Sequence, residues 1–347
     1  MWSRLTFCLI VSLHVLLLQS SITNSSKSTG APPKPSLPSL LNDPTWALGL
    51  RLYRVLRSDA SSVNTLFSPL LLASSLEVLA EGSVGKTASQ IQDLLKPPSK
   101  AKGQIGDLLS VALKTFVEAN GTSFQTRTSS GLFTKQTPAF SQAFTKVSQS
   151  RLGLQHHMLG KGDSKADLKQ LLDWFKAALS GKEGAPFDVE IKAKAGAMIL
   201  ADTIHFKGLW QREMSEESTD RRTFLGKKYT KVIMMHRAGL YRFHEDVDNM
   251  VQVLEAPLWG GKASLVLLLP FHVENLARLD KLLTPELLSK WLERTANTTV
   301  AVSLPKANIS SALSLQVGTV WYCKLYDGFL NFLVERWSLE KLRFHSA

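Results

Sequence analysis

The order of the periodic segments limits the fold of this chain more than any other feature of its sequence. Five segments with the apolar spacing of helices come first, at 45–58, 68–80, 88–96, 103–119 and 167–181. Strand-like apolar runs then dominate, at 196–206, 229–236, 239–245, 250–258 and 263–270. Two further helices are expected at 274–283 and 284–295, followed by a strand at 298–305. Because helices and strands do not alternate regularly, this order predicts an α+β architecture and not a doubly wound parallel sheet.

The N-terminus has the layout of a secretory signal peptide. Arg4 precedes the apolar run LTFCLIVSLHVLLL, which gives way to small polar residues. We assign residues 1–21 to the signal, and an uncleaved anchor is the alternative. Residues 22–44 are rich in Ser and Pro and are expected to form a flexible leader. No later segment is apolar enough to span a bilayer, so we expect no membrane association after cleavage.

The cysteines and sequons fit a secretory chain. Cys8 would leave with the signal, so that Cys323 remains alone and the fold must be held by core packing and not by a disulfide. Four Asn-X-Ser/Thr sequons are glycosylation candidates, at Asn24, Asn120, Asn297 and Asn308. We expect a monomer.

Nucleotide, nucleic acid and metal ligands are not expected. The stretch AEGSVGKTASQ at 80–90 approaches a phosphate-binding loop, but a helix and not a strand precedes it. Thr87 to Gln90 form a capping-box pattern, which predicts a helix-to-helix turn. The net charge of +12 is scattered, without a basic helix or aromatic platform for nucleic acid. No catalytic, cofactor or metal motif is found, and the adjacent His156 and His157 should point apart.

Several motifs resemble the serpin family. LFSPLLLASSLEVLAEGSVGKTASQI looks like its helix pair, ADTIHFKGLW like one of its strands with Asp202 in place of the usual Asn, and VQVLEAPLWGGKASLVLLLP like a strand pair. The resemblance covers residues 45–316 and implies a serpin-like fold, with a helical N-terminal half and mixed and antiparallel sheets. Family members then continue through a central strand of the main sheet, the reactive-centre loop and two buried C-terminal strands. Residues 317–347 resemble none of these.

The resemblance therefore implies an incomplete serpin-like domain at 45–316 and a divergent tail at 317–347, as in a truncated splice form or gene model. Without the two C-terminal strands, several residues are expected to lack their normal cover and to leave the chain molten or aggregated: Val251, Val253, Leu265, Leu267 and Leu269. In the tail, Asp327 could begin a helix with one apolar stripe, formed by Phe329, Leu330, Leu333, Val334 and Trp337.

Within the family, MMHRAGLY, LLPFHVENLARLDKLLTPELLSKWL and VAVSLPK resemble the collagen-binding chaperones of the endoplasmic reticulum. This implies a non-inhibitory, non-enzymatic protein without cofactors that binds the collagen or procollagen triple helix in the lumen of the endoplasmic reticulum. The chain ends in FHSA and not in a KDEL-like signal, so an extracellular location is the alternative. A serine-protease inhibitor, inactive here for lack of a reactive-centre loop, is the competing function.

The resemblance also implies site residues. Ser303 matches a collagen-contacting serine, and Lys228 is the nearest counterpart of a basic residue on the strand before MMHR, although a lysine lacks the planar fork of an arginine. His236 and His272 match histidines associated with pH-dependent release, because imidazole gains charge between neutral and mildly acid pH. Ordinary surface histidines are the alternative, and a further histidine of that pattern is replaced by Leu209. A Leu/Tyr/Asp contact set would lie in the replaced segment, so we expect collagen binding to be weakened.

Overall fold

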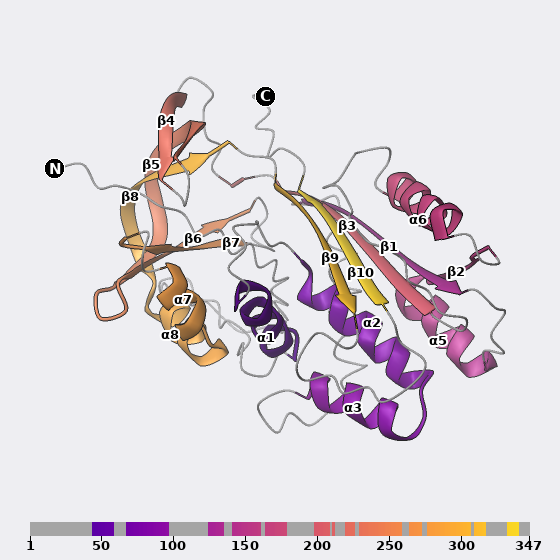
Figure 1. Ribbon diagram of the computed structural model, residues 1–347. Coiled ribbons are helices and arrows are strands. Elements are labelled where there is room, and N and C mark those ends of the chain that lie inside the picture. Colours follow the sequence, from indigo (N-terminus) through magenta and orange to yellow (C-terminus); the bar gives the residue numbers. More distant parts are fainter. Residues whose placement is uncertain are drawn as a thin grey trace, which may run out of the picture.

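Two β-sheets with helices packed on their faces make up the described part of the chain (Figure 1). The protein is represented by a computed structural model. It describes residues 44–58, 67–96, 124–134, 141–160, 164–178, 198–208, 210–211, 219–225, 229–258, 264–272, 276–306, 309–316 and 332–339. Among these residues, no helix is long and apolar enough to cross a membrane.

The helices follow the apolar periodicity of the sequence. They are α1 (Pro44–Ser58), α2 (Pro69–Glu81), α3 (Gly85–Leu95), α5 (Gln142–Leu152), α6 (Ser164–Ala178), α7 (Leu276–Leu282) and α8 (Pro285–Arg294). All of the predicted helices within the described ranges are present, and α5 was not predicted. The helix expected at 103–119 lies outside the described residues.

The strands are concentrated in the second half, as predicted. They are β1 (Phe124–Thr134), β2 (Gln155–Met158), β3 (Met198–Gly208), β4 (Thr219–Leu225), β5 (Tyr229–Asp246), β6 (Val251–Pro257), β7 (Ser264–Pro270), β8 (Ala296–Pro305), β9 (Ile309–Gln316) and β10 (Phe332–Leu339). The two strands expected at 229–236 and 239–245 are one continuous strand, β5. The α+β architecture is confirmed.

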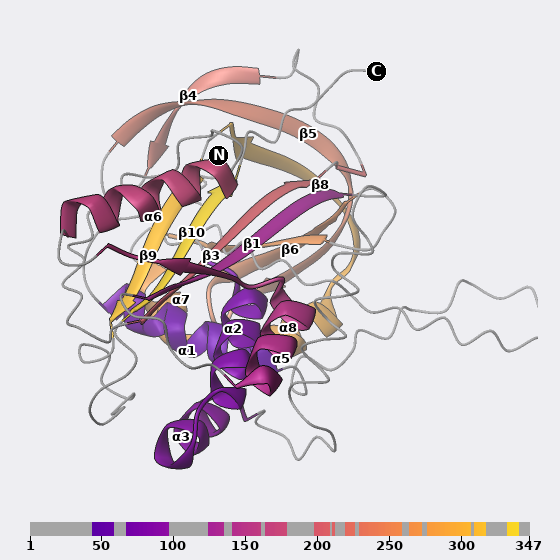
Figure 2. The same ribbon diagram turned by 90° about the vertical axis from the view of Figure 1, so that its right-hand side faces the viewer.

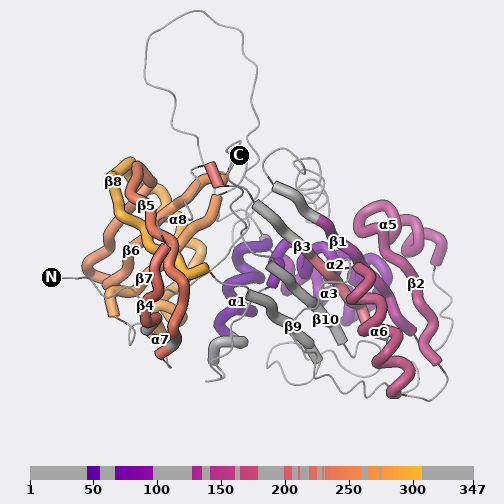
Figure 3. The backbone as a smooth tube through the Cα atoms, turned by 90° about the horizontal axis from the view of Figure 1, so that it is seen from above, coloured from indigo at the N-terminus to yellow at the C-terminus, as the bar shows by residue number. Residues whose placement is uncertain are grey.

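Each sheet has five strands, and they are formed from different parts of the chain. The first has the order β2-β1-β3-β10-β9, and the second has the order β4-β5-β6-β7 with β8 paired to β5. Seen from above, the second sheet with α7 and α8 lies beside the first, and α1 lies between them (Figure 3). The second sheet is therefore built almost entirely from the strand-rich half of the sequence.

Helices cover both faces of the first sheet. Leu132 of β1 and Leu200 of β3 are in one core cluster with α2, α3 and α5, whereas Ile199 and Ala201 are in another with α6. Neighbouring residues of a strand point to opposite faces, which accounts for this division. Figure 2 shows α6 on one side of the sheet and α2, α3 and α5 on the other.

A buried carboxyl group lies under the centre of the first sheet. The Asp202 side chain on β3 accepts hydrogen bonds from Ser75 Oγ of α2 at 2.8 Å and from Ser130 Oγ of β1 at 2.6 Å. Burial raises the pKa of Asp202 to about 6, and the two serine hydrogen bonds offset this only in part. The carboxyl group thus connects a helix and two strands, at a position where the serpin resemblance calls for an uncharged asparagine.

The turn between α2 and α3 is a helix-to-helix connection, as predicted. Ser68 caps α2, because its Oγ accepts a hydrogen bond from the Leu71 backbone N–H at 3.0 Å, and Pro69 occupies the first turn. The capping box expected at Thr87 is wrong. Helix α3 begins at Gly85, after Val84, and no side chain caps it. Gly85, the first residue of the helix and two residues before Thr87, adopts φ +61°, a conformation that favours glycine.

The residues expected to lack cover in the second sheet are packed. Val251 and Val253 of β6 are buried in a cluster with α1, α7 and α8, to which α1 contributes Trp46 and Leu50. Leu267 lies in the cluster on the opposite face, Leu269 is buried and Leu265 is half-buried. The expectation that these five residues are left without cover is therefore wrong, because the sheet lies between α1, α7 and α8 on one face and residues of α2 and β3 on the other.

The tail forms a strand and not the helix that was expected from its apolar stripe. β10 pairs in parallel with β3, with Phe332 opposite Ile199, and antiparallel with β9, with Phe332 opposite Gln316. It thereby lies between the central strand β3 and the edge strand β9 (Figure 1). Asp327, the residue expected to begin the helix, lies outside the described residues.

Candidate binding site on strands β4, β5 and β8

The long strand β5 brings two other strands to one point. Its first half pairs with β4, so that Asp220 lies opposite Met234, and its middle pairs with β8, so that His236 lies opposite Ser303. Even-numbered residues of β4 and β5 share one face of the sheet with the odd-numbered residues of β8 around Ser303. The register therefore places Asp220, Arg222, His236 and Ser303 on the same face.

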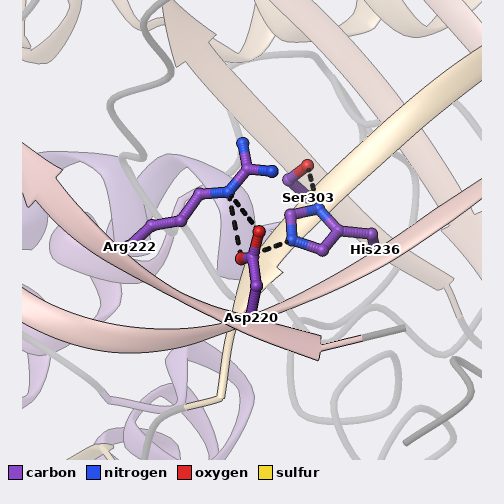
Figure 4. A network of polar contacts seen from close by, with 4 residues as sticks. All are labelled: Asp220, Arg222, His236 and Ser303. Carbon is purple, nitrogen blue, oxygen red and sulfur yellow. Dashed lines mark hydrogen bonds and ion pairs between the residues drawn. The ribbon is translucent and has the colours of Figure 1, made fainter. Parts of the chain in front are cut away.

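These four side chains form one polar network (Figure 4). Arg222 Nε donates to Asp220 Oδ1 at 3.0 Å and Oδ2 at 2.8 Å. His236 Nε2 lies 2.8 Å from Asp220 Oδ1, and His236 Nδ1 lies 2.8 Å from Ser303 Oγ. The side chains of Asp220 and Arg222 are 45% and 46% exposed and that of His236 is 26% exposed, so a partner can reach the network from solvent.

The hydrogen bonds fix the arrangement of protons. The hydrogen bonds from His236 and then Arg222 lower the pKa of Asp220, which is therefore an ionised acceptor. A carboxylate can only accept, so His236 Nε2 must carry a proton, and in the neutral ring Nδ1 must accept from the Ser303 hydroxyl. Protonation of the ring reverses this last bond, because Nδ1–H then donates to Ser303 Oγ and leaves the hydroxyl proton to point elsewhere.

A carboxylate, an imidazole and a hydroxyl group that are hydrogen-bonded in this order also occur in the catalytic triads of hydrolases. A hydrolase needs in addition a pocket for its substrate and donors for an oxyanion. One cavity in the described part of the chain is lined by Val302 and Leu304, which flank Ser303 but face the opposite side of β8, and another lies on α5. Neither of these cavities opens beside the network, whose exposed side chains can form hydrogen bonds with a surface partner.

The structure brings together two of the sequence-predicted site residues, His236 and Ser303. His272 is exposed after the end of β7 and takes no part in the network. Asn297 is exposed on β8, near its start. The remaining candidates, Lys228, Asn24, Asn120 and Asn308, lie outside the described residues.

Asp220 and Arg222 were missed from the sequence. Strand β4 reads TDRRTFL, and three consecutive charged residues hide a strand pattern. The resemblance nevertheless calls for a basic residue on the strand before MMHR, and Arg222 on β4 is a basic residue of the network that contains His236 and Ser303. That requirement was the signal that could have identified it.

The adjacent histidines of β2 point apart, as predicted. His156 Nε2 lies 2.7 Å from Thr134 Oγ1, whereas the His157 ring stacks on Phe133 with ring centroids 4.7 Å apart. Burial lowers the pKa of both histidines, and for His157 the neighbouring His156 adds to this. Within the described residues, no group of three His, Cys, Asp or Glu residues could hold a metal ion.

Several known proteins are similar to this chain in sequence. Serpin H1 of Mus musculus is 30% identical over 279 residues, which cover 80% of this chain and 66% of that protein. Serpin H1 of Bos taurus is 29% identical over 272 residues, covering 78% and 64%. Leukocyte elastase inhibitor A of Mus musculus is 27% identical over 286 residues, covering 79% and 74%. The chain thus spans about two thirds of the length of the Serpin H1 relatives.

A solved structure and a family model agree with these similarities. The crystal structure of mouse protein Z-dependent protease inhibitor matches with a TM-score of 0.76 at 20% identity, covering 87% of this chain and 86% of that chain. This likeness supports the fold. The family model Serpin (serine protease inhibitor) matches residues 45–317. The chain therefore belongs to the serpin family.

Proposed function

We propose that this serpin binds the collagen or procollagen triple helix in the secretory pathway and does so without inhibiting a protease. The resemblance to the collagen-binding chaperones supplies the class of partner. The observation that carries the proposal is the 2.8 Å hydrogen bond between His236 and Ser303. The resemblance implies a pH response for His236 and a collagen contact for Ser303. The two residues are hydrogen-bonded to each other in one exposed network.

Arg222 is the basic residue that we assign to this contact. In the described part of the chain Arg222 bonds Asp220 through Nε alone, so its two terminal amino groups can donate to carbonyl oxygens of a partner. The planar guanidinium suits such paired acceptors better than the ammonium group of Lys228 would. The chains of a collagen triple helix are extended and have a glycine at every third position, which presents backbone acceptors at regular intervals.

Retention on immobilised triple-helical collagen at neutral pH tests the proposal. We expect Arg222→Met to weaken retention about tenfold or more, because a hydrogen bond from a charged group contributes more than a neutral one. Arg221→Met is the matched control, since Arg221 is the exposed neighbour on the opposite face of β4. Equal losses in both variants would indicate a general charge effect, and no loss in Arg222→Met would refute the contact.

The coupling of His236 to Ser303 also supplies a mechanism for release at mildly acid pH. Protonation of the imidazole reverses the hydrogen bond with Ser303, so the hydroxyl group presents different hydrogen-bonding atoms to the partner at acid and neutral pH. We expect His236→Gln to reduce the difference between retention at pH 7.5 and at pH 5.5, while His272→Gln keeps it. A pH response that is intact in His236→Gln would contradict this mechanism.

Protease inhibition is the second candidate, and the similarity to leukocyte elastase inhibitor A is the observation that favours it. Incubation with a panel of serine proteases, followed by a denaturing gel, distinguishes the two. We expect no complex that survives denaturation, and a stable complex would overturn the non-inhibitory assignment.

A further inference from the structure

Asp220 occupies a position defined by donors from two other side chains. Arg222 Nε contacts both carboxylate oxygens, at 3.0 and 2.8 Å, and His236 Nε2 contacts Oδ1 at 2.8 Å (Figure 4). Ser303 holds the other ring nitrogen and so fixes the orientation of the imidazole. The three side chains Arg222, His236 and Ser303 therefore form a receptor for one carboxylate group, which we call the carboxylate site.

The charges around this site favour an anion. Across 219–225, 229–237 and 301–306, the strand segments that surround the site, Asp220 is the only carboxylate. On the face of the site the same segments carry the cation Arg222, whereas Arg221, Lys231 and Arg237 lie on the opposite face of the sheet. Removal of Asp220 from the site would leave the Arg222 guanidinium without its carboxylate partner, and a second carboxylate is attracted to that charge.

The side chain of Asp220 is also placed so that it can leave the carboxylate site. It is the second residue of β4, which lies at the edge of its sheet, and its side chain is 45% exposed. Its ion pair with Arg222 joins residues two apart on the same strand and is exposed, and such pairs hold their partners weakly. An incoming carboxylate could take over the same donors while Asp220 turns into water.

We infer that Arg222, His236 and Ser303 form a binding site for an acidic side chain of the partner, and that Asp220 is an internal substitute which the partner displaces. This inference rests on the proposed function, because it names the group on the triple helix that the site would recognise. A glutamate or aspartate at an outward-facing position of a collagen chain has the required chemistry, and a glutamine of the same shape does not. Asp220 thus lowers the affinity for acidic partners and would make the site selective for those that bind strongly enough to replace it.

Two triple-helical peptides that differ in one residue test the inference. Both consist of Gly-Pro-Pro repeats, and the central triplet carries either Glu or Gln. We expect Asp220→Asn to bind the Glu peptide about tenfold more tightly than the wild-type chain does, with no comparable gain for the Gln peptide. Asp248→Asn is the matched control, because it removes the same charge from the exposed turn between β5 and β6, away from the site.

Sodium acetate is a second probe, independent of collagen. The imidazole resonances of His236 should move during an acetate titration of Asp220→Ala and should respond far less in the wild-type chain, where the site is filled. Acetate binding in Asp220→Ala without any peptide binding would support the carboxylate site and refute the collagen proposal. Equal binding of the Glu and Gln peptides by wild type and Asp220→Asn, with no acetate response, would support collagen binding and refute the carboxylate site.

Discussion

At the scale of single residues, the buried carboxyl group of Asp202 makes the stability of the protein depend on pH. The residue is 1% exposed, and its pKa is raised from 3.8 to about 6. At a pH between these two pKa values, Asp202 keeps its proton in the folded state but has released it in the unfolded chain. The contribution of Asp202 to stability is therefore fully present below about pH 4 and is lost as the pH rises through about 6.

The substitution Asp202→Asn tests this dependence. A shift of roughly two units corresponds to about 3 kcal/mol, so the variant should be more stable than wild type by about that amount at pH 7.5 and by much less at pH 4. Denaturant unfolding of both chains at the two pH values measures the difference, in which other titrating groups cancel. A difference that is constant with pH would show that the pKa of Asp202 is the same in the folded and unfolded states.

Residues of the candidate site were only partly predictable. Ser303 and His236 could be found because each lies within a motif, SLPK and MMHR. Asp220 lies 16 residues before His236 and 83 before Ser303, and no local pattern relates them. Their contact depends on the strand registers of β4 and β8 along β5, which are set by tertiary packing and not by composition.

At the scale of secondary-structure elements, the packing of α2 against α5 depends on Gly82. A Cβ atom at this position would lie 2.5 Å from Cδ2 of Phe144 on α5. We expect Gly82→Ala to destabilise the protein by about 1–3 kcal/mol through overpacking. A double-mutant cycle with Phe144→Leu should show a favourable interaction energy, because the smaller side chain makes room for the methyl group. Additive effects would indicate that the clash is relieved elsewhere.

Elements with one dominant period were predictable, and elements with an ambiguous pattern were not. The helices α1 and α8 have clear amphipathic stripes, whereas α2 is buried nearly all round and has the start signal of Ser68 and Pro69. The apolar residues of FLVERWSL fit both a helix and a strand, and a short run of this kind is decided by its surroundings. In this chain the position between β3 and β9 decides in favour of a strand.

A proline in β10 tests whether this strand completes the first sheet. A strand with neighbours on both sides donates its backbone N–H groups to one or the other, so Val334→Pro removes a ladder bond and should open the sheet locally. Hydrogen–deuterium exchange should rise in β3 and β9 more than in β5, which belongs to the other sheet. If the substitution changed exchange in β3 and β9 no more than in β5, the position of β10 between β3 and β9 would be contradicted.

At the scale of the whole molecule, the packing changes the expectation of a molten chain. One core cluster contains Ile204 of β3, in the first sheet, and Leu71 of α2, a helix that covers this sheet. The same cluster contains Met235, Leu254 and Val302 of the second sheet. Apolar contact of this kind couples the two sheets, since neither can unfold without exposing the face that it shares with the other. We therefore expect a monodisperse chain with one cooperative unfolding transition.

The substitution Leu71→Ala tests this coupling, because Leu71 is 2% exposed and lies in the shared cluster. Truncation of a buried leucine costs about 2–5 kcal/mol. If the two sheets unfold as one unit, hydrogen exchange in denaturant should give β3 and β6 the same midpoint in the wild-type chain, and both midpoints should fall together in the variant. A variant in which only β3 is destabilised would show two independent units. A wild-type chain that binds hydrophobic dyes and melts gradually would show that the shared cluster is too weak to hold the sheets together.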